Sequence, residues 1–207
     1  MFTVKNLSDL RTAVRYVAPH ADKTGDVSVL SGINFRTTKG SAEVTVSATD
    51  RYTLAMIPVP LYVPAPDDVN LTLPAKELVA LLKPLKTGKG RAAVSERADS
   101  RFVHVEAFDA NIAPYALLAV DGEFPRNLET IVPTETGALE SVAFNPTHMA
   151  RFAPARWPGL PTGGTPRVDL TFATNHRPIR VSVPDLPDMV ALIMPLRPSP
   201  DGGAAPT

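Results

Sequence analysis

The stretch Ala48-Thr49-Asp50-Arg51-Tyr52-Thr53-Leu54-Ala55 decides how this 207-residue sequence is interpreted. It belongs with two later segments, Asp121-Gly122-Glu123-Phe124-Pro125 and Leu192-Ile193-Met194-Pro195-Leu196-Arg197. None of the three offers a nucleophile, a metal-binding cluster or a phosphate-binding loop. Each one alone is an ordinary strand or turn sequence, so the information lies in their order and in the strand and helix patterns between them.

Composition describes an ordinary globular protein. Hydrophobic residues make up 44% of the chain, which is enough to bury a core in one large domain or two small ones. Because there is no cysteine, a disulfide framework is excluded. The first residues lack a signal-peptide pattern, and no apolar run is long enough to cross a bilayer, so we expect a cytoplasmic protein without a membrane partner.

The charges balance, with 21 Lys and Arg against 21 Asp and Glu. A protein that grips nucleic acid tightly and reads its sequence usually has an excess of basic residues, so that function is disfavoured. A protein that encircles DNA and slides needs only weak, local positive charge, and neutrality is compatible with this.

Three segments have helical spacing, at residues 7–18, 74–85 and 145–155. Ser8 is the expected N-cap of the first, and Asn145 followed by Pro146 opens the third. The apolar side chains expected to point inward are Leu10, Ala13, Val14, Val17 and Ala18, then Leu78, Val79, Leu81, Leu82 and Leu85, then Met149, Phe152 and Ala153.

A short strand is expected before each helix, at residues 1–4, 70–73 and 141–144, and further strands after it. The clearest of these are residues 32–37, 42–47, 102–107 and 167–172. Lys39-Gly40-Ser41 is the expected hairpin turn between two of them. The chain is therefore predicted to be an α+β protein made of three similar strand-helix-strands units.

In this context the three opening segments resemble the signature segments of the bacterial DNA polymerase III beta subunit, the DNA sliding clamp. The resemblance implies the DNA-clamp fold, with helices on one face and antiparallel sheets on the other. Residues 1–133 are similar to the family's complete middle domain, with half-units at about 1–66 and 67–133. Residues 134–139 would be a linker, 140–197 the second half of the last domain, and 198–207 a disordered tail.

The resemblance implies a non-enzymatic processivity factor without cofactors. Its apolar cleft would bind short peptides of DNA polymerase and DNA-maintenance proteins, and a clamp loader is a further expected partner. The cleft positions that match are Leu30, Thr49, Tyr52, Leu54, Pro133, His176, Pro178, Leu192, Ile193, Met194, Pro195, Leu196 and Arg197.

The resemblance also implies that basic residues on the outward sides of the helices contact double-stranded DNA. This binding would be weak and independent of the base sequence. These residues are Arg11, Arg15, Lys76, Lys83, Lys86, Arg151 and Arg156. The alternative is that these basic residues belong to ordinary solvent-exposed helix faces and have no role in DNA binding.

Three half-units cannot encircle DNA alone, so we expect a homo-oligomer in which the edge of the third unit drives self-association. One alternative is a decoy that sequesters clamp partners without encircling DNA. Another, of a different class, is a metal-dependent phosphoryl-transfer enzyme that uses Asp50, Asp121 and Asp169. A third alternative is a purely structural assembly protein.

Overall fold

The computed structural model describes residues 2–24, 28–83, 91–97, 100–107, 115–133, 142–152, 167–173, 177–184 and 186–196. The chain divides into two compact units. Unit 1 comprises Met1–Asp50 and Leu54–Pro125, and unit 2 comprises Arg51–Thr53 and Arg126–Thr207. The three residues Arg51–Thr53 therefore pack with unit 2, although unit 1 flanks them on both sides in the sequence.

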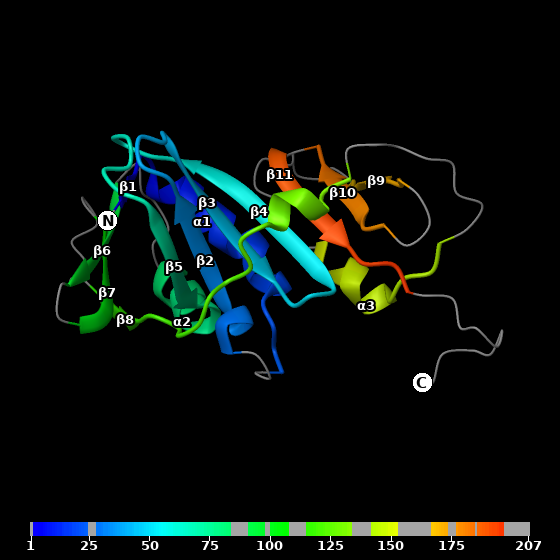
Figure 1. Cartoon of the computed structure of the whole chain (residues 1–207), viewed down its shortest axis with the longest axis horizontal. Helices are drawn as coiled ribbons and strands as arrows, with labels where there is room; N and C mark the ends of the chain where they lie inside the picture. Colours follow the sequence, from blue (N-terminus) through cyan, green and yellow to red (C-terminus); the bar gives the residue numbers. More distant parts are fainter. Residues whose placement is uncertain are drawn as a thin grey trace. The chain divides into compact units, whose positions relative to one another are not determined.

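Unit 1 is built on antiparallel strands in two groups (Figure 1). In one group the strands lie in the order β5-β2-β3-β4, and in the other in the order β1-β6-β7-β8. Their bounds are β1 (Phe2–Val4), β2 (Gly32–Thr37), β3 (Glu43–Thr49), β4 (Thr53–Pro60), β5 (Val69–Pro74), β6 (Ala92–Arg97), β7 (Ser100–Ala107) and β8 (Tyr115–Leu118).

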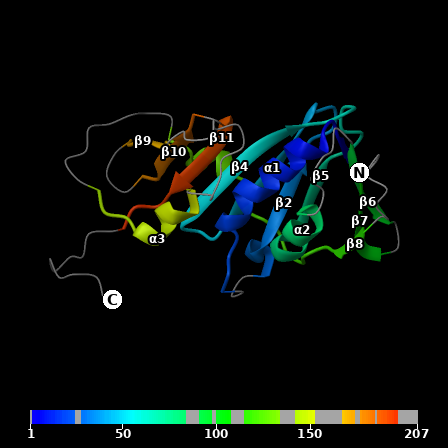
Figure 2. The same cartoon turned by 180° about the vertical axis from the view of Figure 1, so that it is seen from behind.

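Two helices cover one face of these strands, α1 (Leu7–Val17) and α2 (Ala75–Leu82), as Figure 2 shows. They contact each other, α1 also contacts β3, and α2 contacts β2 and β5. The core beneath them includes Phe2 and Phe35, whose rings stack with centroids 5.8 Å apart. This arrangement confirms the predicted α+β class with helices on one face and antiparallel strands on the other.

The first helix follows its predicted span closely, but the predicted cap is wrong. The N-cap residue is Asn6, which precedes the helix, whereas Ser8 lies inside its first turn. The Asn6 Nδ2 atom donates to Asp9 Oδ2 at 2.9 Å, so an acid in the first turn anchors the side chain that precedes the helix. Ala13, Val14 and the other periodic positions up to Val17 are buried as expected, because their spacing places them on one face.

The second helix buries a narrower face than its sequence predicts. Leu78 and Leu82 are buried, but Val79 is exposed and Leu81 is only half-buried. Leu78 and Leu82 are four positions apart and share one side of the helix, whereas Val79 lies about 100° around the axis from Leu78. The inward assignment of Val79 was therefore wrong.

The hairpin between β2 and β3 is confirmed. Gly40 has a φ of 82°, which glycine adopts without the steric cost that other residues have there. The Ser41 N–H donates to the Thr38 carbonyl at 2.9 Å and closes the turn. Strand β2 has the predicted ends, and β1, β3, β5, β7 and β9 differ from prediction by at most two residues at either end.

Unit 2 has strands in the order β11-β10-β9, with bounds Leu186–Ile193, Ile179–Val183 and Asp169–Thr171. Its helix α3 is short, Pro146–Met149, and is followed by the 3-10 turn η4 (Ala150–Phe152). A further 3-10 turn, η3, spans Leu128–Ile131.

The opening of α3 is confirmed, because the Thr147 N–H donates to Asn145 Oδ1 at 2.9 Å and Pro146 is the first helical residue. The strand predicted just before it is wrong for the described residues 142–144. A single bond there, from the Leu196 N–H to the Ala143 carbonyl, is too little to form a strand ladder. Within the described residues, no helix is long and apolar enough to cross a membrane.

Candidate peptide-binding site and DNA-facing surface

Tyr52 projects from a tight turn at the end of β3. The preceding residue, Arg51, has a φ of 77°, a left-handed conformation that non-glycine residues adopt only at some cost. This turn carries Arg51–Thr53 into unit 2. The Tyr52 side chain remains 56% exposed, so a large aromatic ring is held at the surface of this unit.

The residues that follow β11 join this turn through the backbone. The Met194 N–H donates to the Tyr52 carbonyl at 2.8 Å, and the Leu196 N–H donates to the Ala143 carbonyl at 2.8 Å. Met194 and Pro195 are half-buried, and Leu196 is 46% exposed. We call the four residues Tyr52, Met194, Pro195 and Leu196 the Tyr52 patch.

The short helix α3 and the turn η4 contact the Tyr52 turn through two side chains. The His148 ring stacks on Tyr52 with centroids 5.5 Å apart and planes inclined by 27°. From the next turn, Arg151 Nη1 donates to the buried Thr53 Oγ1 at 2.8 Å. A ring and a guanidinium on neighbouring turns thus hold two consecutive residues of the Tyr52 turn.

The other predicted cleft residues divide between the units. In unit 1, Leu30, Thr49 and Leu54 are buried, and Thr49 and Leu54 are register partners of β3 and β4. In unit 2, Pro178, Leu192 and Ile193 are buried and Pro133 is half-buried. His176 and Arg197 lie outside the described residues. The patch is therefore the part of the predicted cleft that unit 2 itself brings together and leaves accessible.

Four of the predicted DNA-facing residues belong to the two helices of unit 1 or, for Lys83, to the C-cap of α2. Arg15, Lys76 and Lys83 are exposed, and Arg11 is half-buried. The acids on these helices are Asp9 and Glu77. Arg151 lies in unit 2 beneath the patch, and Lys86 and Arg156 lie outside the described residues.

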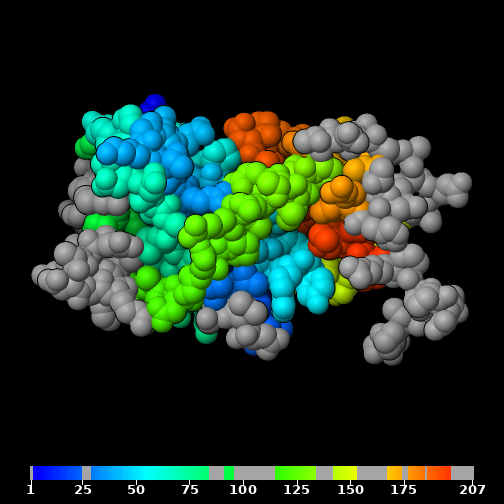
Figure 3. All heavy atoms as spheres, viewed as in Figure 1, coloured from blue at the N-terminus to red at the C-terminus, as the bar shows by residue number. Residues whose placement is uncertain are grey.

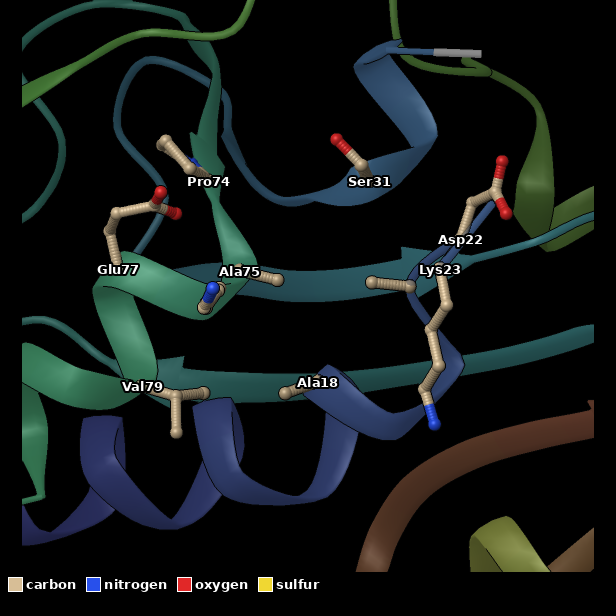
Figure 4. A pocket seen from close by; sticks show the side chains of 10 residues that line it. Ala18, Asp22, Lys23, Ser31, Pro74, Ala75, Glu77 and Val79 are labelled. Carbon is tan, nitrogen blue, oxygen red and sulfur yellow. The ribbon is translucent and has the colours of Figure 1, made fainter. Parts of the chain in front are cut away.

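A half-open pocket of about 580 Å³ lies in unit 1 where α2 begins (Figure 4). Ala18, Ala75 and Val79 give it apolar walls. Its charged residues are Asp22, Lys23, Lys76 and Glu77, two of each sign. Because these charges cancel, the pocket adds no positive potential beyond that of the helix face.

The three carboxylates of the phosphoryl-transfer alternative have different surroundings. Asp50 is buried, Asp121 is exposed, and Asp169 Oδ1 accepts from Arg167 Nε at 2.8 Å. In the part of the chain that the structure describes, no group of three His, Cys, Asp or Glu side chains is arranged to hold a metal ion. The geometry therefore adds nothing in favour of that alternative.

The segment around Asp121 has a structural role. Gly122 has a φ of 109°, and a Cβ atom added there would lie 3.2 Å from the Cβ of Val29. Next to it, Phe124 is buried, and the Val120 N–H donates to the Thr72 carbonyl at 2.9 Å. Figure 3 shows the light-green segment that follows β8 running along the surface. The segment Asp121-Gly122-Glu123-Phe124-Pro125 thus packs onto unit 1 through the contact of Gly122 with Val29.

The model of the family described as "DNA polymerase III beta subunit, central domain" matches residues 5–126, more than half of the chain. The chain belongs to the DNA polymerase III beta subunit family. The match covers the turn that carries Tyr52, both helices of unit 1 and the segment around Gly122. A search of curated proteins found no match.

Solved structures of beta subunits share the fold. The DNA polymerase sliding clamp from Bacillus subtilis superposes with a TM-score of 0.74 at 16% identity, covering 95% of this chain and 64% of that one. The beta subunit from Thermotoga maritima gives a TM-score of 0.71 at 15% identity, with 95% and 66% covered. That from Borrelia burgdorferi gives 0.72 at 17%, with 94% and 63% covered. This chain thus spans less than two thirds of the length of these beta subunits.

Two contributors to the site were not predicted from the sequence. His148 was not among the predicted site residues, and Ala143 was placed in the strand expected at residues 141–144. Neither residue has a signal in the sequence that points to its partner, Tyr52 for His148 and Leu196 for Ala143, because contacts between residues about 50 to 95 positions apart leave no local pattern. Only the cap at Asn145, three residues before His148, indicates where the helix that carries the ring begins.

Proposed function

We propose that this chain is a sliding-clamp-type processivity factor that presents the Tyr52 patch to short peptides of DNA polymerases and DNA-maintenance proteins. The observation that carries this proposal is the 2.8 Å bond from the Met194 N–H to the Tyr52 carbonyl. That bond joins two of the three segments on which the family resemblance rests.

The chemistry of the patch suits an apolar peptide side chain. Tyr52 offers a large, rigid surface with a polar tip, and Met194 offers an adaptable thioether. Burial of a Leu or Phe side chain from the peptide contributes roughly 1.5 to 3 kcal/mol. Two such side chains contribute roughly 3 to 6 kcal/mol, whereas a micromolar complex needs about 8 kcal/mol after the costs of association, so backbone hydrogen bonds and further contacts must supply the rest.

The second part of the proposal concerns DNA. Arg11, Arg15, Lys76 and Lys83 come from two helices that contact each other, so they give one face of unit 1 a local basic excess. We propose that this face lies against phosphates of the duplex. Such contacts are weak and independent of base sequence, which suits a protein that slides.

In the decoy alternative, the patch binds the same peptides but the protein does not encircle DNA. A nicked circular plasmid distinguishes the two. A protein that encircles DNA is retained on the circle and released when the plasmid is linearised, whereas a decoy is retained on neither.

The direct test of the patch is the affinity for a fluorescein-labelled peptide taken from the clamp-binding segment of a polymerase, measured by anisotropy. Leu196→Asp places a charge beside the apolar side chain to be buried, and we expect it to weaken binding at least about 10-fold. Val63→Asp is the matched control, because Val63 is 51% exposed and lies in unit 1.

A scrambled peptide of the same composition should bind neither protein. Equal affinity of the Leu196→Asp variant and the unchanged chain would refute the peptide site, as would tight binding of the scrambled peptide.

A further inference from the structure

We propose that Arg180 makes the Tyr52 patch selective for peptides that carry an acidic side chain beside the apolar one. This inference rests on the proposed function and adds to it the charge of the peptide. Arg180 belongs to β10, the middle strand of the order β11-β10-β9, and its side chain is half-buried. Its Nε atom is buried and, among the described residues, has no hydrogen-bond partner.

The register of β10 and β11 places Arg180 beside the patch. Arg180 is paired with Leu192, so the two side chains leave the strands on the same face. Met194 follows Leu192 by two positions, directly after the end of β11, and positions two apart in an extended chain share a face. A long side chain reaches such a diagonal neighbour, whose Cα atom lies about 7 to 8 Å away. The guanidinium of Arg180 therefore lies within reach of a peptide held at Met194.

On its other side Arg180 has no acidic partner. Its register neighbour in β9 is Thr171, which is uncharged. The acid on that face of β9 is Asp169, whose Oδ1 atom already accepts from Arg167 Nε at 2.8 Å. Within the described part of the chain, no carboxylate forms an ion pair with Arg180. These residues thus leave a half-buried positive charge uncompensated.

A carboxylate of the bound peptide is the group that matches these donors. Arginine stays charged and presents its N–H groups in a planar fork, to which a carboxylate binds through two parallel hydrogen bonds. An amide of the same size lacks the charge and offers only one acceptor oxygen. Because Arg180 is half-buried, salt screens such a pair less than it screens a pair at the surface. Arg180 should therefore distinguish Asp from Asn in the peptide.

The alternative is that Arg180 acts only through its aliphatic stem. The methylene groups of an arginine cover apolar surface while the charged head stays near water, and here the stem lies beside Leu192. Such a role has no connection with the charge of a peptide. Gln at position 180 keeps part of the stem and removes the charge, so Arg180→Gln separates the two roles.

The first experiment compares pairs of fluorescein-labelled peptides that differ only in one Asp or Asn. The exchanged residue is moved in turn to each position near the apolar side chain, and affinities are measured by anisotropy. In at least one pair, we expect the Asp peptide to bind about 5- to 10-fold more tightly than its Asn counterpart. Equal binding of both members of every pair would contradict the proposal.

The second experiment replaces the arginine. Arg180→Gln should bind the Asp peptide as weakly as the unchanged chain binds the Asn peptide, and its affinity for the Asn peptide should not change. A variant that still prefers Asp would overturn the role of Arg180. Equal loss of both peptides would also overturn it, because Arg180 would then support the patch without recognising the charge of the peptide.

Arg177→Gln is the matched control. Arg177 is exposed, belongs to unit 2 and carries the same charge three positions before Arg180. Its replacement should leave the preference for Asp intact. If Arg177→Gln abolishes this preference as Arg180→Gln does, the overall positive potential selects the peptide and the proposal fails.

The outcomes separate this inference from the proposed function. Peptides that bind without any preference for Asp leave the Tyr52 patch intact as a binding site and refute only the role of Arg180. Absence of binding by every peptide refutes both proposals.

Discussion

The Tyr52 patch and the α1–α2 face are both candidate binding surfaces, and they are made in different ways. The helix face consists of charged side chains that local helical spacing brings to one side. The patch consists of apolar side chains from segments about 140 residues apart, joined by the bond between Met194 and Tyr52. A surface of the first kind attracts a polyanion weakly and over a distance, whereas one of the second kind captures an apolar side chain at contact. Salt should therefore weaken binding at the helix face and hardly affect the patch, whereas removal of an apolar side chain should weaken binding at the patch and hardly affect the helix face.

Salt gives the largest expected difference. If Arg11, Arg15, Lys76 and Lys83 each neutralise one phosphate, raising NaCl from 50 to 200 mM should weaken duplex binding about 100-fold. Peptide binding should change less than about 2-fold, because burial of apolar groups does not depend on counterion release. Anisotropy titrations with labelled duplex and labelled peptide in the same buffers measure both.

A matched pair of variants sharpens this test. Replacing Arg15 and Lys76 with Gln should lower the salt slope by about 2 and leave peptide affinity intact. Lys39→Gln removes an exposed lysine from the β2–β3 turn and should leave the slope unchanged. If Lys39→Gln changes the slope as much, the helix face has no special role.

Removing the patch's aromatic ring should have the next largest effect. Tyr52→Ala should weaken peptide binding about 30-fold, as expected for an exposed aromatic anchor at the centre of a binding site. Tyr52→Phe keeps the ring and should retain most of the affinity. Duplex binding should be unchanged in both variants. Loss of duplex binding in Tyr52→Ala would mean that the two surfaces are not separable.

The same contrast explains what the sequence could predict. Helix α1 and the hairpin at Gly40 follow from short-range rules, namely apolar spacing and a left-handed turn position. The α1–α2 face could be predicted because its residues need only those rules. The third helix shows the limit, since the cap at Asn145 was right but the α-helical part ends at Met149. Propensity does not determine where an α-helix gives way to a 3-10 turn.

The patch could be predicted only through family resemblance. Tyr52 and Met194 were assigned to one cleft because the family's segments match, and no periodicity in the chain connects them. Burial also escaped prediction, because Leu54 and Leu192 are buried while Leu196 is exposed. Which apolar residue remains at the surface depends on the complete packing.

A smaller effect tests the support beneath the patch. His148→Ala removes the ring that stacks on Tyr52, a contact worth about 0.5 to 1.5 kcal/mol. Peptide affinity should therefore fall about 2- to 10-fold, measured by anisotropy. His148→Phe should restore it, since it supplies another ring at the same position. Failure of Phe to rescue would show that histidine acts there through its nitrogens and not through stacking.

The smallest effect concerns the cap that starts α3. Asn145 Oδ1 accepts from the Thr147 N–H at 2.9 Å and from Thr147 Oγ1 at 2.7 Å, so Asn145→Ala leaves both donors without this partner. We expect a loss of about 1 kcal/mol, seen as a lower urea midpoint at unchanged slope, with Asn145→Asp retaining most of the stability.

Asn127 is the matched control for that cap. It precedes η3 but makes no side-chain capping bond, so Asn127→Ala should change the midpoint little. Because α3 carries His148 against Tyr52, fraying of its first turn should also reach the patch and lower peptide affinity slightly. Duplex binding should stay constant, since α1 and α2 belong to unit 1. If Asn145→Ala and Asn127→Ala destabilise equally, the capping bond does not hold α3 in place, and the ring of His148 depends on other packing for its position.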